Sequence, residues 1–148
     1  MKIQIEVKNV EKAISNIKRL FNESNRPMNN ILMGGAQEIR KEAVRSIQQD
    51  PKTGRIYQMY NPKREHRASA PGESPATDTG NLVRNIKAVN STKNEVMVQS
   101  NAPYSQDLEL GSGRILPRPF LFPATEKAGK KIVMVMFNYI KSMIASAK

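Results

Sequence analysis

The first residues of the chain alternate strictly between apolar and polar positions. Ile3, Ile5 and Val7 are each separated by one polar residue, which is the two-residue period of a half-buried strand. We therefore predict a strand over about residues 2–8.

A helical period follows the alternating segment. Apolar residues recur at spacings of three and four from Val10 to Phe21, and Asn9 precedes them as a candidate N-cap. This pattern predicts a helix over about residues 10–23. The polar stretch Asn22–Pro27, which ends in a proline, predicts a break.

The apolar period resumes at Met28 and predicts a second helix over about residues 28–49. This helix should end before Pro51, since a proline disfavours helical geometry at the preceding residue. Gly34 and Gly35 lie inside it and indicate a kink, a close backbone approach, or the start of a shorter helix.

The chain changes character between Pro51 and Gly80. This segment contains four prolines and three glycines and shows no sustained apolar period, apart from a possible short strand at Arg55–Tyr60. Loops of this length are uncommon in compact domains and are often functional. We predict a long extended loop or flexible arm over about residues 51–79.

Three further elements follow the predicted arm. Apolar residues from Leu82 to Val89 and from Val96 to Val98 flank the polar run Asn90–Asn94, a pattern that predicts a β-hairpin. Residues Tyr104–Leu110 are consistent with a helical turn. A long helix should begin at about residue 119 or 123, after a group of prolines, and continue to about 146.

The last predicted helix is apolar almost all round. Its wide stripe comprises Ile132, Val133, Met136, Phe137, Ile140, Met143, Ile144 and Ala147. Met134, Val135 and Tyr139 lie off this stripe. Because a helix that is apolar all round must be covered all round, either the helix packs wholly inside the monomer or its second side faces a neighbouring subunit.

Together these elements predict one α+β domain over residues 1–148. We expect a small antiparallel or mixed β-sheet packed against two or three helices, one of them the long C-terminal helix, together with the extended arm. The longest apolar run, Ile132–Phe137, is far shorter than the roughly 20 residues of a membrane-spanning helix. With no secretory signal visible, we expect a cytoplasmic origin.

Composition excludes several classes of catalytic site. The chain has no cysteine and a single histidine, His66, so thiolate metal sites, cysteine nucleophiles and histidine clusters are absent. No phosphate-binding glycine loop is present. If residues 104–110 were extended, Asp107 and Glu109 would share one face and could bind Mg²⁺ for phosphodiester cleavage, but no third ligand is evident. We expect Glu109 instead to pair with Arg114 or Arg118.

Charge leaves a second function open. The chain carries 24 Lys and Arg against 13 Asp and Glu, a net charge of +11, which attracts phosphates or acidic protein surfaces. Basic and aromatic residues are interleaved in the predicted arm at Arg55, Tyr57, Tyr60, Lys63, Arg64 and Arg67. These residues are the candidate partner-binding set, and a sequence-nonspecific nucleic-acid-binding protein is the alternative function.

Three strings occur together in order: SAPGESPATDTGNLVRNI at 69–86, VMVQSNAPYSQDLELGSG at 96–113 and RPFLFPATEKA at 118–128. In combination they resemble the tail-completion proteins of long-tailed bacteriophages, also described as minor tail components, head-to-tail joining proteins or tail-terminator-like proteins. Leu110 departs from the family pattern, in which an aromatic residue is commoner at this position.

The resemblance implies a virion protein without catalytic activity or cofactor. Such subunits form a ring, expected to be a hexamer, which closes the tail tube and joins it to the head connector or stopper protein at the neck. Passing DNA would meet it only through nonspecific phosphate contacts, and assembly would take place in the host cytoplasm. We expect the structural and interface residues to be Tyr104, Glu109, Gly111, Arg118, Pro119, Phe120, Val135 and Tyr139.

Overall fold

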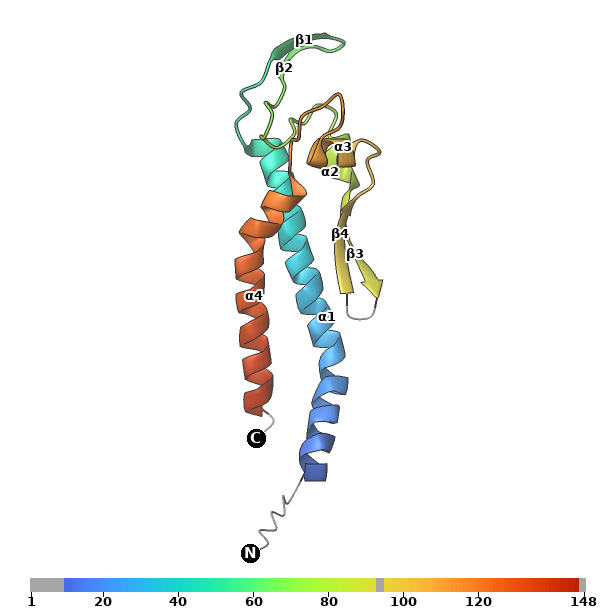
Figure 1. Cartoon of the computed structure of the whole chain (residues 1–148), viewed down its shortest axis with the longest axis vertical. Helices are drawn as coiled ribbons and strands as arrows, with labels where there is room; N and C mark the ends of the chain where they lie inside the picture. The colour runs from blue at the N-terminus through green and yellow to red at the C-terminus, as the bar shows by residue number, and fades with distance from the viewer. Residues whose placement is uncertain (1–9, 93–94, 147–148) are drawn as a thin grey trace, which may run out of the picture.

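A computed structural model describes residues 10–92 and 95–146 of the chain, with side chains described from residue 29 onward except those of residues 143 and 146. Its order of elements is helix, hairpin, short helix, hairpin, short helix and long helix (Figure 1). The strand predicted over residues 2–8 lies outside the described residues.

The longest element is helix α1, Val10–Gln49. It ends just before Pro51, as predicted, but the predicted break at Asn22–Pro27 is wrong because one helix runs through this segment. A proline inside a helix removes one backbone hydrogen bond, and its ring fixes φ near the helical value, so a proline weakens a helix without always ending it.

Helix α4, Leu121–Ser146, runs alongside the second half of α1 (Figure 1). Of the three interpretations of Gly34 and Gly35, the close backbone approach is confirmed at Gly35. A Cβ on Gly35 would lie 3.0 Å from Cγ2 of Ile132 on α4. A Cβ on Gly34 would meet nothing within 4 Å. Gly35 therefore lets α4 pack closely on α1.

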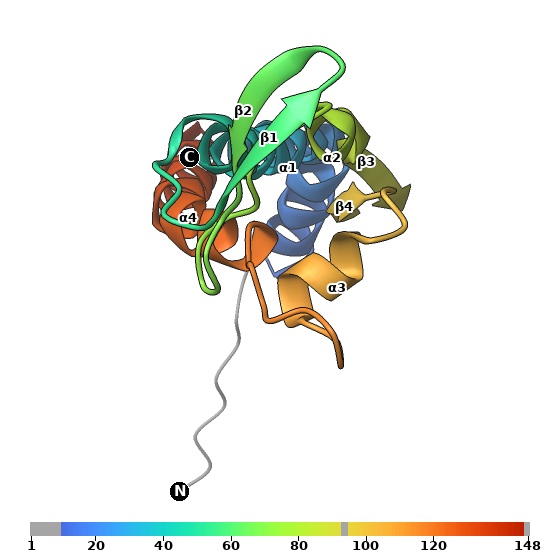
Figure 2. The ribbon, with the colours of Figure 1, turned by 90° about the horizontal axis from the view of Figure 1, so that it is seen from above.

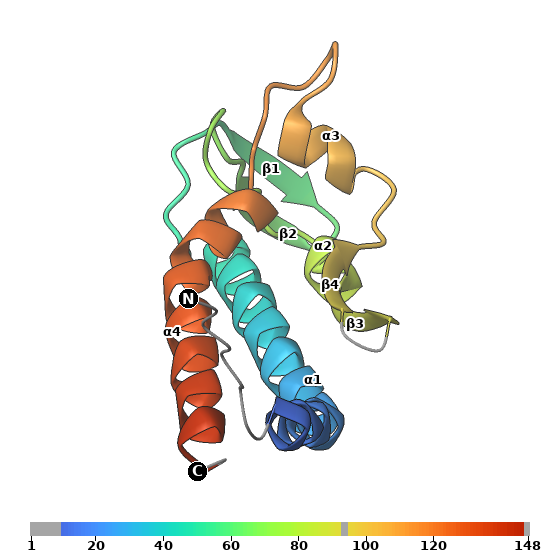
Figure 3. The ribbon, with the colours of Figure 1, turned by 60° about the horizontal axis from the view of Figure 1, so that its bottom comes forward.

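The predicted β-hairpin is confirmed, but its first strand begins at Ile86 and not at Leu82, because residues 81–85 are helical. Strands β3, Ile86–Thr92, and β4, Glu95–Ser100, pair antiparallel with Ala88 opposite Val98. A short helix that the sequence analysis did not predict, α2 (Asn81–Asn85), precedes them. The predicted helical turn is α3, Ser105–Leu110. The β3–β4 hairpin packs on α1, and β4 is the strand nearer to that helix (Figures 1 and 3).

The predicted arm contains more structure than expected. Strand β1, Ile56–Tyr60, matches the short strand predicted there, and it pairs antiparallel with an unpredicted strand, β2, Lys63–Arg67. This hairpin projects beyond the end of α1 (Figures 1 and 2).

The buried core lies where α1, α4 and the β3–β4 hairpin meet. It comprises Ala43, Ile47, Leu82, Ile86, Ala102, Phe120 and Ala124. The α+β fold class with a long C-terminal helix is thus confirmed, with two separate two-stranded sheets among the described residues. No helix in the described ranges is long and apolar enough to cross a membrane.

Candidate assembly surfaces

The start of α4 is held by a carboxylate from α3. The two oxygens of Glu109 accept hydrogen bonds from three successive backbone N–H groups, at 2.8 Å from Phe120, 3.0 Å from Leu121 and 2.8 Å from Phe122. The first N–H groups of a helix have no partner within the helix, and a negative charge is favourable at that end. Glu109 therefore acts as a cap supplied from another element.

The ion pair expected between Glu109 and Arg114 or Arg118 is wrong. No such pair occurs among the described residues, because both oxygens of Glu109 face the backbone of α4. Arg118 instead donates through Nε to the carbonyl of Ser69 at 3.2 Å, and its backbone N–H donates to the carbonyl of Leu108 at 2.6 Å. Arg118 thus ties the loop before α4 to the part of the arm that lies between β2 and α2.

The other residues expected in this corner lie nearby. Phe120 is only 1% exposed and belongs to the core. Gly111 has a φ of 79°, and a Cβ there would lie 2.9 Å from the ring of Pro117, so only glycine fits. Tyr104 is partly exposed, and its hydroxyl accepts a hydrogen bond from Nδ2 of Asn81 at 3.0 Å. Pro119 lies half-buried just before Phe120.

The second half of α4 carries a large uncovered apolar surface. We define the α4 face as the exposed apolar side chains on one side of its axis, namely Val133, Met134, Phe137, Ile140 and Ile144. Val135 is also exposed, but it lies on the other side of the helix and lines a hollow between α1 and α4. Exposure reaches 66% for Val133 and 64% for Phe137. A contiguous exposed patch of this kind is typical of a binding surface.

The predicted division of α4 into two sides is partly wrong. Val133 and Phe137 were placed on the inner stripe but are exposed, whereas Tyr139 was placed off the stripe but is half-buried, like Ile132 and Met136. The reason is that α4 packs mainly on one helix, α1, and a single helix covers only a narrow strip of another. The hypothesis that α4 packs wholly inside the monomer is therefore wrong for the described residues.

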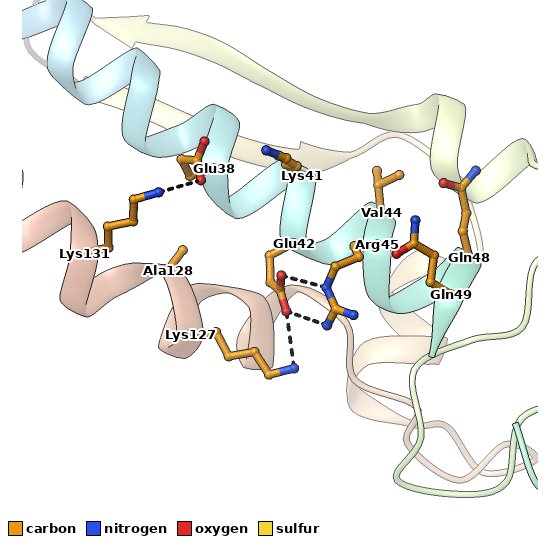
Figure 4. Close-up of a pocket in the computed structure, with 10 residues that line it drawn as sticks. All are labelled: Glu38, Lys41, Glu42, Val44, Arg45, Gln48, Gln49, Lys127, Ala128 and Lys131. Carbon is orange, nitrogen blue, oxygen red and sulfur yellow. Dashed lines mark hydrogen bonds and ion pairs between the residues drawn. The ribbon is translucent and has the colours of Figure 1, made fainter. Parts of the chain in front are cut away.

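Ion pairs join α4 to α1 on the side shown in Figure 4. Both carboxylate oxygens of Glu42 accept hydrogen bonds from Arg45, at 2.8 and 2.9 Å, and Nζ of Lys127 on α4 lies 3.3 Å from Oε1 (Figure 4). Hydrogen bonding to Arg45, followed by that to Lys127, lowers the pKa of Glu42 to about 2. These residues line an open hollow of about 540 Å³, in which every charged group seen in Figure 4 comes from α1 or α4.

The base of the arm is anchored by hydrogen bonds. Glu73 accepts from the hydroxyl of Thr53 at 2.5 Å and from the backbone N–H of Ala70 at 2.8 Å, and these bonds lower its pKa to about 2. A Cβ on Gly54 would lie 2.5 Å from the carbonyl oxygen of Ala68, so only glycine allows the two backbones to approach this closely.

The candidate arm residues divide between the two faces of the β1–β2 hairpin. Tyr60, Lys63 and Arg67 share the face that also carries Ile56, and Tyr60 is 85% exposed. On the other face Tyr57 lies opposite the half-buried His66. Arg64, on that same face, forms an ion pair with Asp78. Arg55, just before β1, stacks over the ring of Tyr57 at 5.5 Å.

Asp107 and Glu109 cannot bind one Mg²⁺ ion together in this structure. Residues 105–110 are helical, so Asp107 and Glu109 point about 200° apart around the axis. Glu109 is also occupied by three backbone N–H groups. Within residues 10–92 and 95–146 no group of three or more His, Asp or Glu side chains is arranged to hold a metal ion.

Comparison of the chain with protein-family models, with curated proteins and with solved structures finds no match in any of the three. The assignment of a function therefore depends on the surfaces described above and on the motifs of the sequence.

Proposed function

We propose that this chain is a structural virion protein of a tailed bacteriophage. It forms a homo-oligomeric ring, a hexamer by resemblance to the tail-completion proteins, that closes the tail tube and joins the tail to the head connector or stopper protein. Its action is binding alone, with no catalytic step and no cofactor. Its place is the neck of the virion, after assembly in the host cytoplasm.

The α4 face is the observation that carries this proposal. Large apolar side chains left in water favour association, because burial gains roughly 25 cal/mol for each Å² of apolar surface. A specific interface buries about 800 Å² on each partner around an apolar centre. Phe137 and Val133, both more than 60% exposed, supply such a centre on a long, regular helix.

The corner that links α3 to α4 supports the same function. Glu109, Arg118 and Phe120 fix the direction in which α4 leaves the core. A ring subunit must present its contact surfaces at a fixed angle, because a heterologous contact closes into a ring only if its rotation is correct. The strings that resemble the tail-completion family include these residues.

The test is the mass of the purified protein in solution by light scattering, alone and after mixing with tail tubes, followed by electron microscopy of the tubes. We expect the mass of a ring of about six subunits, or density that caps the head-proximal end of the tube in the micrographs. A monomer that never associates with itself or with tubes would contradict it.

A second candidate function is nonspecific binding of nucleic acid by the arm. The observation that favours it is the exposed hairpin face, on which Tyr60 lies opposite Lys63 at one end and Arg67 lies opposite Ile56 at the other. Two phosphate contacts would make the affinity for duplex DNA fall about tenfold between 50 and 200 mM salt. The double variant Lys63→Ala/Arg67→Ala should remove that dependence, whereas the matched change of two other exposed lysines, Lys41→Ala/Lys87→Ala, should not.

A further inference from the structure

The outer edge of strand β4 is open. β4 pairs with β3 on one side, and no other strand of the described chain pairs with it. Two-stranded hairpins are marginal on their own, and a sheet gains stability when a third strand is added. An open edge also presents unpaired N–H and C=O groups, so it is a template for another strand.

An apolar groove runs beside that open edge. Its volume is about 280 Å³, and it is lined by Val96 and Val98 of β4, by Leu32, Gly35, Ala36 and Ile39 of α1, and by Thr125 and Ile132 of α4. In Figure 3, α1 lies between α4 and the β3–β4 hairpin. A strand added to β4 would place every second side chain over this groove.

One segment of the chain has the pattern that the groove requires. Ile3, Ile5 and Val7 are spaced two residues apart, as Val96 and Val98 are on β4, and the residues between them are all polar. Inward-facing aliphatic side chains would fill the groove beside the two valines, because neighbouring strands place side chains of the same face next to one another. The polar residues between them would face water.

The length of α1 decides which copy supplies this segment. Leu32 lies 22 residues after Val10 in one continuous helix, a separation of about 33 Å along the axis. An extended chain covers at most about 3.6 Å per residue, so Ile3 can lie no more than about 25 Å from Val10. The segment therefore cannot reach the groove of its own chain while α1 is continuous.

We propose that residues 2–8 of a second copy add as a strand to the open edge of β4 and seat Ile3, Ile5 and Val7 in the groove between α1, β4 and α4. This inference rests on the proposed function and names one contact between subunits of the ring. The backbone hydrogen bonds supply affinity, and the groove selects the register.

Cysteine cross-linking tests the contact directly, because the chain has no cysteine of its own. Single-cysteine variants at position 3, 5 or 7 are mixed with variants at position 96 or 98, and the assembled protein is oxidised. A disulfide requires Cα atoms about 4.4–6.8 Å apart. At least one mixed pair should give a covalent dimer on a non-reducing gel. Gln4→Cys is the matched control, because its side chain would point away from the groove and should not cross-link.

A pair of charge substitutions tests the same contact through assembly. Ile5→Glu should lower the assembled fraction at least tenfold, because the carboxylate would enter an apolar groove. Gln4→Glu adds the same charge on the water-facing side and should assemble like the unsubstituted protein. Far-ultraviolet circular dichroism of both variants should match that of the unsubstituted protein.

The outcomes separate this inference from the proposed function. Cross-links only within one chain, in a variant that carries both cysteines, would overturn it and make the chain's own segment the occupant. Normal assembly of Ile5→Glu, or no cross-link at any pair, would also overturn it, although the ring itself would stand. If the unsubstituted protein forms no ring with or without tubes, the proposed function fails together with the contact.

Discussion

Glu109 and Phe120 are joined by a hydrogen bond of 2.8 Å from the backbone N–H of Phe120 to the carboxylate, and the side chain of Phe120 is buried in the core. One carboxylate thus caps α4 from outside the helix and holds an aromatic residue in place. The Glu109–Phe120 contact therefore links the first turn of α4 to the buried core.

The first prediction concerns this cap. Glu109→Ala should lower the free energy of unfolding by about 1–3 kcal/mol, because three N–H groups lose a charged acceptor. Urea denaturation followed by circular dichroism measures the change. Asp107→Asn is the control on the same short helix, since Asp107 is exposed, and it should alter stability by less than about 0.5 kcal/mol. Equal losses in the two variants would argue against the cap.

The second prediction concerns the α4 face. Val133→Asp and Phe137→Asp should each abolish ring formation and leave the monomer folded, because both side chains are largely exposed and a charge there opposes only the contact between subunits. Asn138→Asp, an exposed neighbour on the same helix, should still assemble. Light scattering gives the mass and circular dichroism the fold. Unfolding of the first two variants would instead show that the face is internal core.

The third prediction uses the two adjacent glycines of α1. Alanine stabilises a helix by about 1 kcal/mol relative to glycine, so Gly34→Ala should raise stability because its Cβ meets open space. Gly35→Ala puts a Cβ 3.0 Å from Ile132, and overpacking costs about 1–3 kcal/mol. We expect Gly35→Ala to be the less stable of the two by chemical denaturation. The reverse order would contradict the close approach of α4.

The fourth prediction is a loss of stability in acid. The pKa of Glu42 and that of Glu73 are both lowered from 4.5 to about 2. A carboxyl with a lowered pKa stabilises the fold fully above its unfolded pKa and loses this effect as the pH falls toward the folded value. The unfolding temperature should therefore fall between about pH 4.5 and 2. The double variant Glu42→Gln/Glu73→Gln should show a smaller fall, and an identical profile would contradict the prediction.

The sequence predicted those elements whose pattern is local. Three such predictions are confirmed: the long helix α4, the β3–β4 hairpin and the end of α1 before Pro51. Each depends only on residues that are close in the sequence. Strand β2 was missed because Lys63–Arg67 contains no large aliphatic residue and depends on pairing with β1. The break at Asn22–Pro27 was wrong because a proline lowers helix stability without fixing where a helix ends.

The candidate surfaces were less predictable than the elements. The sequence pointed to Glu109 in the corner, but its partners are backbone N–H groups that the fold brings close, and no side-chain pattern reveals these. The face of α4 that is covered depends on the position of α1. Periodicity showed that the helix is apolar nearly all round, but it did not show that Tyr139 is half-buried and Phe137 exposed.

The central claim is that this chain assembles into a ring on the tail tube. The most direct test measures its mass by light scattering with and without purified tail tubes and images the tubes by electron microscopy. We predict a ring of about six subunits or a cap at the head-proximal tube end, and we expect Phe137→Asp to abolish both. A protein that stays monomeric, ignores the tubes and binds duplex DNA with steep salt dependence would contradict it.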